Sequence, residues 1–192
     1  MKRLLFLFYL ILIALVGNKG ALAQDAFDAY KKHDYANAYR GFEKLASAGD
    51  FNAMNNLGLM YMSGEGVAVN YAQAADWFEK AASHGHLSAI NNLGTLYEMG
   101  QGRQQNFGTA AQYYRVAADR GMSDAQFNLA ALYEQGHGVP KDIMQAYIWY
   151  GLAARSGDAD AKIAQKKVGD TISPNVIGSA DAFIKNWQQA SK

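Results

Sequence analysis

One stretch of this chain repeats itself every 36 residues, and that repetition restricts the possible folds more than any other feature. Segments that begin at residues 53, 89 and 125 carry the same residue at ten corresponding positions. In the first segment these positions hold Ala53, Asn56, Leu57, Tyr61, Gly64, Gly66, Ala74, Ala81, Ala82 and Gly85. A fixed period of this length predicts a repeat architecture, in which each copy is one supersecondary unit that buries its apolar face against its neighbours.

The first half of each copy has the pattern of an amphipathic helix. In the first copy Ala53, Leu57 and Tyr61 are spaced by four residues, which places them on one face of a helix with 3.6 residues per turn. Gly64 and Gly66 follow, and glycine tolerates the positive φ angles at which helices end. The first helix is therefore expected to stop at this glycine pair.

The second half of each copy predicts a second helix. Asn70, Asn106 and Asp142 occupy the same position in the three copies and are expected to be its N-caps. Gln73 and Gln145, three residues further along, predict a capping box in two copies. In the first copy the buried face of this helix is expected to consist of Ala74, Phe78, Ala81 and Ala82.

Two linked motifs summarise the copies. Residues 53–85 read Ala-x-x-Asn-Leu-Gly-x-x-Tyr-x-x-Gly-x-Gly and then Ala-x-x-Trp-Phe-x-x-Ala-Ala-x-x-Gly. The pattern recurs at 89–121 and 125–157, with Ala130 in place of one glycine and with Tyr-Tyr or Trp-Tyr in place of Trp-Phe. This order of residues resembles the Sel1-like repeat family, a branch of the tetratricopeptide-type α-solenoids. The resemblance implies an all-α solenoid of stacked antiparallel helix pairs, a right-handed superhelix with a concave groove, and a role as an adaptor.

The flanks of the array predict two caps and a leader. We divide the chain into a signal peptide (1–23), an N-terminal tetratricopeptide-like capping hairpin (24–52), repeats at 53–88, 89–124 and 125–160, and a C-terminal partial repeat with a capping helix (161–192). Ser173 and Pro174 predict the start of that last helix, with serine as N-cap and proline at the first helical position. Caps are expected because an end repeat has only one neighbour to bury against.

The N-terminus has the three parts of an export signal. Lys2 and Arg3 precede an apolar run over residues 4–16, which is shorter than the roughly 20 residues that a membrane-spanning helix needs. Ala21 and Ala23 form an Ala-x-Ala cleavage pattern. We therefore expect cleavage near Ala23, a location in the periplasm or outside the cell, and no transmembrane anchor after cleavage; an uncleaved N-terminal anchor is the alternative.

Composition and side-chain spacing argue against several kinds of chemistry. The chain has 18 Lys and Arg against 17 Asp and Glu, whereas nucleic-acid binders usually carry a basic excess, so no nucleic-acid partner is expected. It has no cysteine, which excludes disulfides and thiolate ligands or nucleophiles. His84 and His86 flank a helix-ending glycine and are expected to be ordinary helix-end residues. No catalytic residue, metal or cofactor is predicted.

An asparagine at the same position of each copy is the most informative polar feature. By analogy with tetratricopeptide arrays, this register is expected to face the groove, where amides can bind the backbone of an extended peptide. The alternative is that these asparagines brace the scaffold. The candidate groove residues are Asn55, Asn56, Leu59, Met62, Asn91, Asn92, Thr95, Glu98, Phe127, Asn128 and Glu134. Asp124 and Asp160 are expected to add negative charge at the C-terminal end.

These observations lead to two functional hypotheses. The first is an exported scaffold that binds a peptide segment of a protein partner in the cell envelope. The second is a binder or hydrolase of cell-wall material, such as peptidoglycan or β-lactam-like compounds, for which the sequence offers no nucleophile–base pair. The repeat register also predicts that Tyr97 lies in the core of the central copy, where truncation would cost several kcal/mol.

Overall fold

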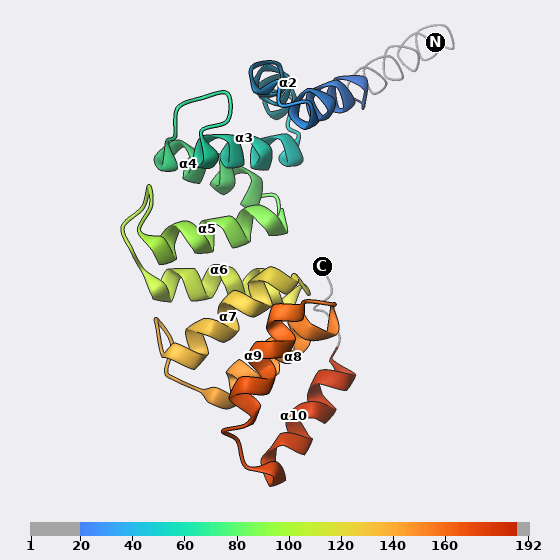
Figure 1. Ribbon diagram of the computed structural model, residues 1–192. Helices are drawn as coiled ribbons and strands as arrows, with labels where there is room; N and C mark the ends of the chain where they lie inside the picture. Colours follow the sequence, from blue (N-terminus) through green and yellow to red (C-terminus); the bar gives the residue numbers. More distant parts are fainter. Residues whose placement is uncertain (1–19, 188–192) are drawn as a thin grey trace, which may run out of the picture. The chain divides into compact units, whose positions relative to one another are not determined.

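The structure, a computed structural model, describes residues 20–187, and the regular elements in this range are all helices (Figure 1). Residues 20–31 form the first described helix. The others are α2 (Tyr35–Ser47), α3 (Phe51–Ser63), α4 (Tyr71–Ala82), α5 (Leu87–Met99), α6 (Phe107–Asp119), α7 (Ser123–Gln135), α8 (Ile143–Arg155), α9 (Ala159–Gly169) and α10 (Pro174–Asn186). The all-α prediction is confirmed.

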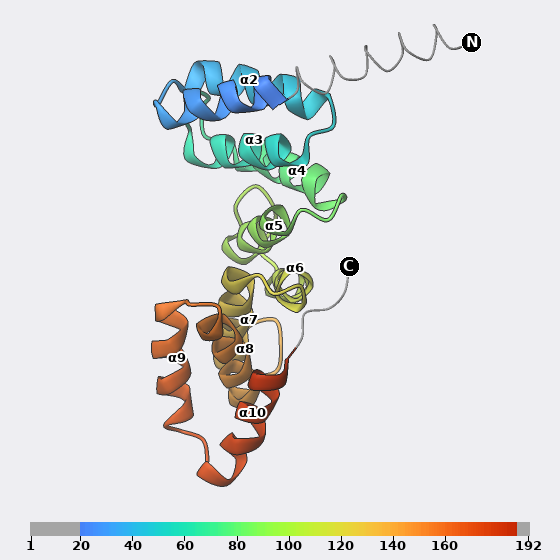
Figure 2. The same ribbon diagram turned by 90° about the vertical axis from the view of Figure 1, so that its right-hand side faces the viewer.

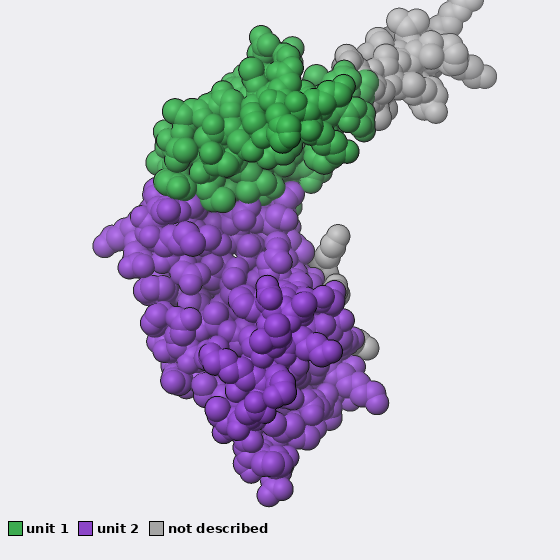
Figure 3. All heavy atoms as spheres, in the orientation of Figure 1, with its two compact units in different colours: residues 1–84 green, residues 85–192 purple. Residues whose placement is uncertain are grey.

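The described residues form two compact units, one that ends at residue 84 and one that begins at residue 85 (Figure 3). In the first unit α2 packs on α3 and α3 on α4. In the second unit each helix from α5 to α8 packs on the next one, and α10 returns to lie against α8 (Figure 2). Each predicted repeat is therefore a pair of packed helices, α3 with α4, α5 with α6 and α7 with α8, and within the second unit the last two pairs stack through α6 and α7.

The second helix of each pair begins at the predicted cap. The side chains of Asn70, Asn106 and Asp142 each accept a hydrogen bond from the backbone N–H three residues later, at 3.1, 2.9 and 2.9 Å. The predicted capping box is wrong in its second half. The N–H of Asn70 donates to the carbonyl of Tyr61 at 2.8 Å, so it is not available to the side chain of Gln73.

The glycine pair acts as the sequence predicts. Gly64 ends α3 with a φ of +77°, and Gly66 follows with a φ of +75°. Both angles lie in the left-handed region, which residues other than glycine rarely adopt. The paired glycines after α5 and α7 have the same conformation.

The core of each repeat is built around one ring on the second helix. Phe78, Tyr114 and Tyr150 occupy corresponding positions, and all three are buried. A Cβ atom added to Gly94 would lie 2.6 Å from the ring of Tyr114, so this ring rests directly on the backbone of α5. Gly58 bears the same relation to Phe78. In the first two repeats the glycine after the recurring leucine therefore makes room for the ring, whereas the third repeat carries Ala130 at this position.

Tyr97 does not occupy the predicted core position. Its side chain is half-buried and stacks on the ring of Tyr113 with a centroid distance of 5.7 Å. The corresponding core residue is Tyr114, which is 1% exposed. The register of the repeat is right, but the ring that fills the centre comes from the second helix and not the first.

The ends of the described chain are helical as well. Residues 24–52 hold most of the first described helix, all of α2 and the start of α3. The predicted partial repeat, which begins at residue 161, holds most of α9 and all of α10, with Pro174 in the first turn of α10. The predicted signal peptide falls largely outside the described residues, since only residues 20–23 of it are included, and these are helical. Between residues 20 and 187, no helix is both long and apolar enough to cross a membrane.

Candidate functional site

The predicted groove residues lie on the first helices of the repeats, α3, α5 and α7. In the first unit Asn55 is 7% exposed and therefore part of the packed interior, while Asn56, Leu59 and Met62 are partly exposed. Asn56 lines a cavity of about 450 Å³ together with Phe27, Gln24, Phe42, Leu45 and Asn52. In this unit the structure thus places one of the recurring asparagines, Asn56, at an open surface.

In the second unit two candidate asparagines bind each other. The Nδ2 atom of Asn128 donates to Oδ1 of Asn91 at 3.1 Å, joining α7 to α5. Asn91 is 7% exposed, so this hydrogen bond is largely shielded from water. Asn92 also makes an interaction. Bracing of the scaffold therefore accounts for part of the asparagine pattern, and the acceptor Oδ1 of Asn128 can still receive a donor from outside.

The two candidate glutamates are held by tyrosines of the second helices. The hydroxyl of Tyr114 donates to Glu98 at 2.6 Å and lies 3.2 Å from the hydroxyl of Thr95. The hydroxyl of Tyr150 donates to Glu134 at 2.9 Å. Burial, followed by the bond to the carboxylate, raises the pKa of both phenols well above the ordinary value. These hydrogen bonds tie each first helix to its partner.

Glu134 and Phe127 have further contacts inside the second unit. Glu134 also accepts a hydrogen bond from Lys167 of α9 at 3.0 Å. Phe127 meets the ring of Tyr150 edge-on at a centroid distance of 5.2 Å. The predicted groove residues of the second unit that make these contacts with the scaffold are therefore Asn91, Thr95, Glu98, Phe127, Asn128 and Glu134.

An acidic hollow remains open at the α7–α9 side of the second unit. A cavity of about 240 Å³ is lined by Phe127 and Asn128 of the predicted set and by Asp124, Asp158 and Asp160. Asp158 is the N-cap of α9, where its carboxylate accepts from the N–H of Ala161 at 2.9 Å. Sequence reasoning identified four of the five lining residues and missed Asp158, which falls at the boundary that precedes α9. The sequence did carry a signal for Asp158, namely its position as an N-cap, because Asp50 occupies the corresponding position before α3.

The histidines have structural roles. His84 stacks on Phe51 with a centroid distance of 4.1 Å, and Nδ1 of His86 accepts from the N–H of Ala89 at the start of α5. No group of three or more His, Cys, Asp or Glu side chains in the described part of the chain is arranged to hold a metal ion.

Comparison with known proteins identifies the repeat. The sequence model of the Sel1 repeat matches residues 52–86, 87–122 and 123–158. The chain belongs to the Sel1 repeat family. The matched segments begin one or two residues before the starts predicted from the period, next to the N-caps of α3, α5 and α7. Sel1 repeats mediate protein–protein interaction. No curated protein matches this chain.

Two solved structures illustrate the similarity. A Sel1 repeat protein from Oxalobacter formigenes is 33% identical, with a TM-score of 0.68, over 72% of this chain and 57% of that one. A protective antigen present in uropathogenic Escherichia coli strains, which displays an SLR fold, is 33% identical with a TM-score of 0.72, over 81% of this chain and 34% of that one. The chain thus spans about half of the first structure and a third of the second.

Proposed function

We propose that this chain is an exported interaction module whose Sel1 repeats bind a peptide segment of a protein partner in the cell envelope. The observation that carries the proposal is the hollow beside Asn128, where an aromatic ring and an amide are surrounded by three aspartates. Phe127 offers apolar contact area, and the Oδ1 atom of Asn128 offers an acceptor for a backbone N–H. The aspartates select a segment with lysine or arginine side chains.

Export is supported by the sequence of the first 23 residues, with its basic start, its short apolar run and its Ala-x-Ala pattern. The scaffold role is supported by the three matched repeats. No observation specifically favours the cell-wall hypothesis, which predicts capture of cell-wall fragments in place of a protein.

The proposal is tested by photocrosslinking in intact cells. A photoreactive amino acid placed at Asp124 or Asp160, both exposed, is expected to capture one protein, while the same group at Asp170, exposed at the far end of α9, captures none. Fractionation of the same cells is expected to recover the chain from the periplasm or the medium. Capture of peptidoglycan fragments in place of a protein, or retention in the cytoplasm, would contradict the proposal.

Affinity for the captured partner then tests the charge of the hollow. Asp160→Lys places a cation where a basic segment is expected and should weaken binding by about tenfold or more. Asp170→Lys makes the same charge change on the same helix at a site exposed to water and should leave the affinity within about twofold. Equal losses in the two variants would show that net charge matters and the hollow does not.

A further inference from the structure

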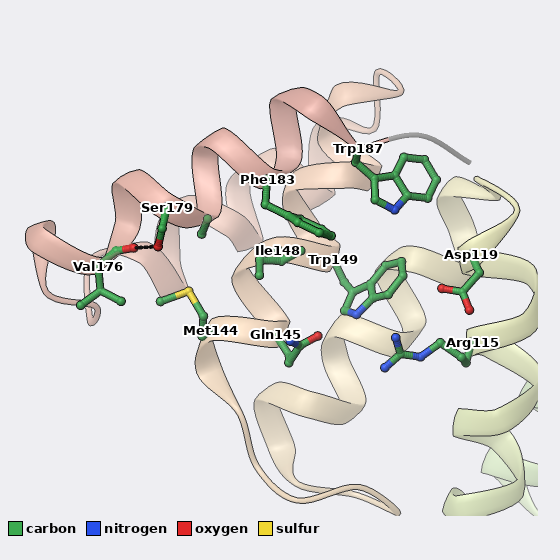
Figure 4. Close-up of a pocket in the computed structure, with 11 residues that line it drawn as sticks. Arg115, Asp119, Met144, Gln145, Ile148, Trp149, Val176, Ser179, Phe183 and Trp187 are labelled. Carbon is green, nitrogen blue, oxygen red and sulfur yellow. Dashed lines mark hydrogen bonds between the residues drawn. The ribbon is translucent and has the colours of Figure 1, made fainter. Parts of the chain in front are cut away.

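A second cavity, of about 460 Å³, lies between α6, α8 and α10 of the second unit and includes none of the predicted groove residues (Figure 4). Its apolar lining comes from Met144 and Ile148 of α8 and from Val176, Phe183 and Trp187 at α10. Its polar lining comes from Arg115 and Asp119 of α6 and from Gln145, Trp149 and Ser179. The volume is in the range of sites that bind small ligands.

The position of α10 keeps this cavity open. The hydroxyl of Tyr147 donates to Asp181 at 2.7 Å, and the guanidinium of Arg155 donates to the carbonyl of Ile184. These contacts fix α10 on α8 while Ala180 and Ile184 are buried between them. Val176 and Phe183 stay 47% and 51% exposed at the rim of the cavity. Large apolar side chains left exposed around one cavity indicate a binding surface.

The cavity also contains a buried donor without an acceptor. Trp149 is 5% exposed, and its indole Nε1 atom is buried with no hydrogen-bond partner. In Figure 4 this nitrogen is turned toward the side of the cavity where Arg115 and Gln145 lie. A buried donor left unpaired is unfavourable, so an oxygen atom supplied by a ligand would be bound strongly there.

Arg115 adds positive charge next to this donor. Its guanidinium lies 4.9 Å from the ring centroid of Trp149 and donates to the hydroxyl of Tyr133 at 2.6 Å. A guanidinium has five N–H groups in a planar fork that suits a carboxylate. The indole N–H and the guanidinium together therefore favour an anionic oxygen ligand, and the apolar rim favours a large apolar group attached to it.

Two further side chains distinguish a peptide from a simple fatty acid. The carboxylate of Asp119 and the amide oxygen of Gln145 are acceptors at the same cavity. They suit the backbone N–H groups of a peptide, whereas a fatty acid carries no donor for them.

We propose that this cavity binds the C-terminal residue of a peptide that ends in a large apolar side chain. The terminal carboxylate binds Arg115 and the indole N–H of Trp149, and the side chain lies against Met144, Ile148 and Phe183. The peptide N–H groups bind Asp119 and Gln145. This site lies on other helices than the acidic hollow, so it does not depend on the function proposed above.

Indole N–H signals in a ¹H–¹⁵N NMR spectrum report directly on this site. The chain has three tryptophans, Trp77, Trp149 and Trp187, and two of them line the cavity. The probe is the blocked peptide acetyl-Gly-Ala-Ala-Leu with a free C-terminal carboxylate. It is expected to shift the signals of Trp149 and Trp187 saturably and to leave that of Trp77 unchanged, with assignments taken from single Trp→Phe variants.

The amidated form of the same peptide separates carboxylate recognition from apolar contact. It is expected to bind at least about tenfold more weakly, since it lacks the anionic oxygen. Equal binding of the two forms would overturn the proposal, and so would the absence of any shift. Sodium decanoate is the third probe: if it shifts Trp149 and the peptide does not, the site takes fatty acids and the peptide assignment is wrong.

Two substitutions at exposed side chains test the rim of the cavity without altering the buried core. Val176→Asp places a negative charge at the rim and is expected to weaken binding of the carboxylate peptide by about tenfold or more. Ile163→Asp on α9, at a side chain 69% exposed and outside the cavity, makes the same change and should leave binding unaltered. Unaltered binding in Val176→Asp, with the fold intact by circular dichroism, would place the peptide elsewhere.

Discussion

The first repeat differs from the two later repeats in the ring at its core and in the side chain at one position of its first helix. In the first repeat the buried ring is Phe78 on α4, and the predicted groove residue on α3 is Met62. In the second and third, the corresponding residues are Tyr114 with Glu98 and Tyr150 with Glu134, each joined by a hydrogen bond. A ring with a hydroxyl is thus matched by a carboxylate, and a ring without one by an apolar side chain.

This difference shows what the glutamates do. A carboxylate that accepts a short hydrogen bond from a buried phenol links the two helices of its repeat, so its presence in only two copies follows the tyrosine. The acidic character of the predicted groove is therefore in part a property of the scaffold. The aspartates of the hollow beside Asn128 have no such ring partner among their contacts in the structure, and they are the better candidates for a ligand.

The strongest test of the comparison is truncation of the central ring. Tyr114→Ala removes a fully buried side chain and should lower the free energy of unfolding by about 3–5 kcal/mol. Tyr97→Ala, which truncates a half-buried ring on the first helix, should cost about 1–2 kcal/mol. Denaturant unfolding of the two variants measures both values. A larger loss for Tyr97→Ala would mean that the wrong ring has been placed at the centre.

Alkaline pH should break the hydroxyl–carboxylate pairs. A phenol whose pKa is higher in the folded than in the unfolded chain stabilises the fold fully below the unfolded value, ordinarily about 10, and loses this contribution as the pH rises toward the folded value. Burial and the bond to Asp181 raise the pKa of Tyr147 to about 12, and Tyr114 and Tyr150 shift in the same direction. The melting temperature should therefore fall steeply above about pH 10.

The double variant Tyr114→Phe/Tyr150→Phe sharpens this test. It lacks the two hydroxyls and should be less stable than the natural chain at neutral pH by about 1–3 kcal/mol in total, because each lost hydrogen bond is worth about 0.5–1.5 kcal/mol. Its melting temperature should fall less between pH 9 and 11. Parallel pH curves for the two proteins would show that other groups cause the alkaline loss.

The sequence predicts those features of the fold that depend on contacts between residues close together in the chain. The period, the glycine turns and the N-caps at Asn70, Asn106 and Asp142 depend on nearby residues, and each was predictable from spacing. The burial of Phe78 on the second helix was predicted correctly, but Tyr97 on the first helix was predicted to be buried as well, because both positions are aromatic and periodic and spacing alone does not rank their burial. The Asn128–Asn91 bond and the cavity at Trp149 join separate helices, which a one-dimensional pattern does not bring together.

A buried residue of the third repeat offers a stabilising substitution. Gln126 is 1% exposed, and its Oε1 atom is buried without a partner, while its Nε2 atom donates to the carbonyl of Ala118 at 3.1 Å. The first two repeats carry Met54 and Ile90 at this position. Gln126→Met removes the unpaired acceptor and leaves the carbonyl of Ala118 bonded to the N–H of Gly121. We expect a gain of about 1 kcal/mol in unfolding experiments, and a loss of that size would show that the amide is paired in solution.

The smallest expected change in stability concerns the start of α7, which lacks the side-chain cap found at the corresponding helix starts. Asp50, His86 and Asp158 cap α3, α5 and α9 with a side-chain acceptor, whereas Met122 stands at the same position before α7 and makes no such bond. Its backbone has a φ of −72° and a ψ of 113°, close to −81° and 113° at Asp50, so an aspartate is compatible with the geometry already present. Met122→Asp should add about 0.5–1 kcal/mol through one capping bond, partly offset by the Coulomb repulsion between its carboxylate and the nearby one of Asp124 in the first turn. Met122→Asn carries the same acceptor without the charge, so it should gain at least as much. If neither variant raises the melting temperature, the methionine side chain contributes packing that outweighs a cap, and the third repeat differs from its neighbours by more than the loss of a hydrogen bond.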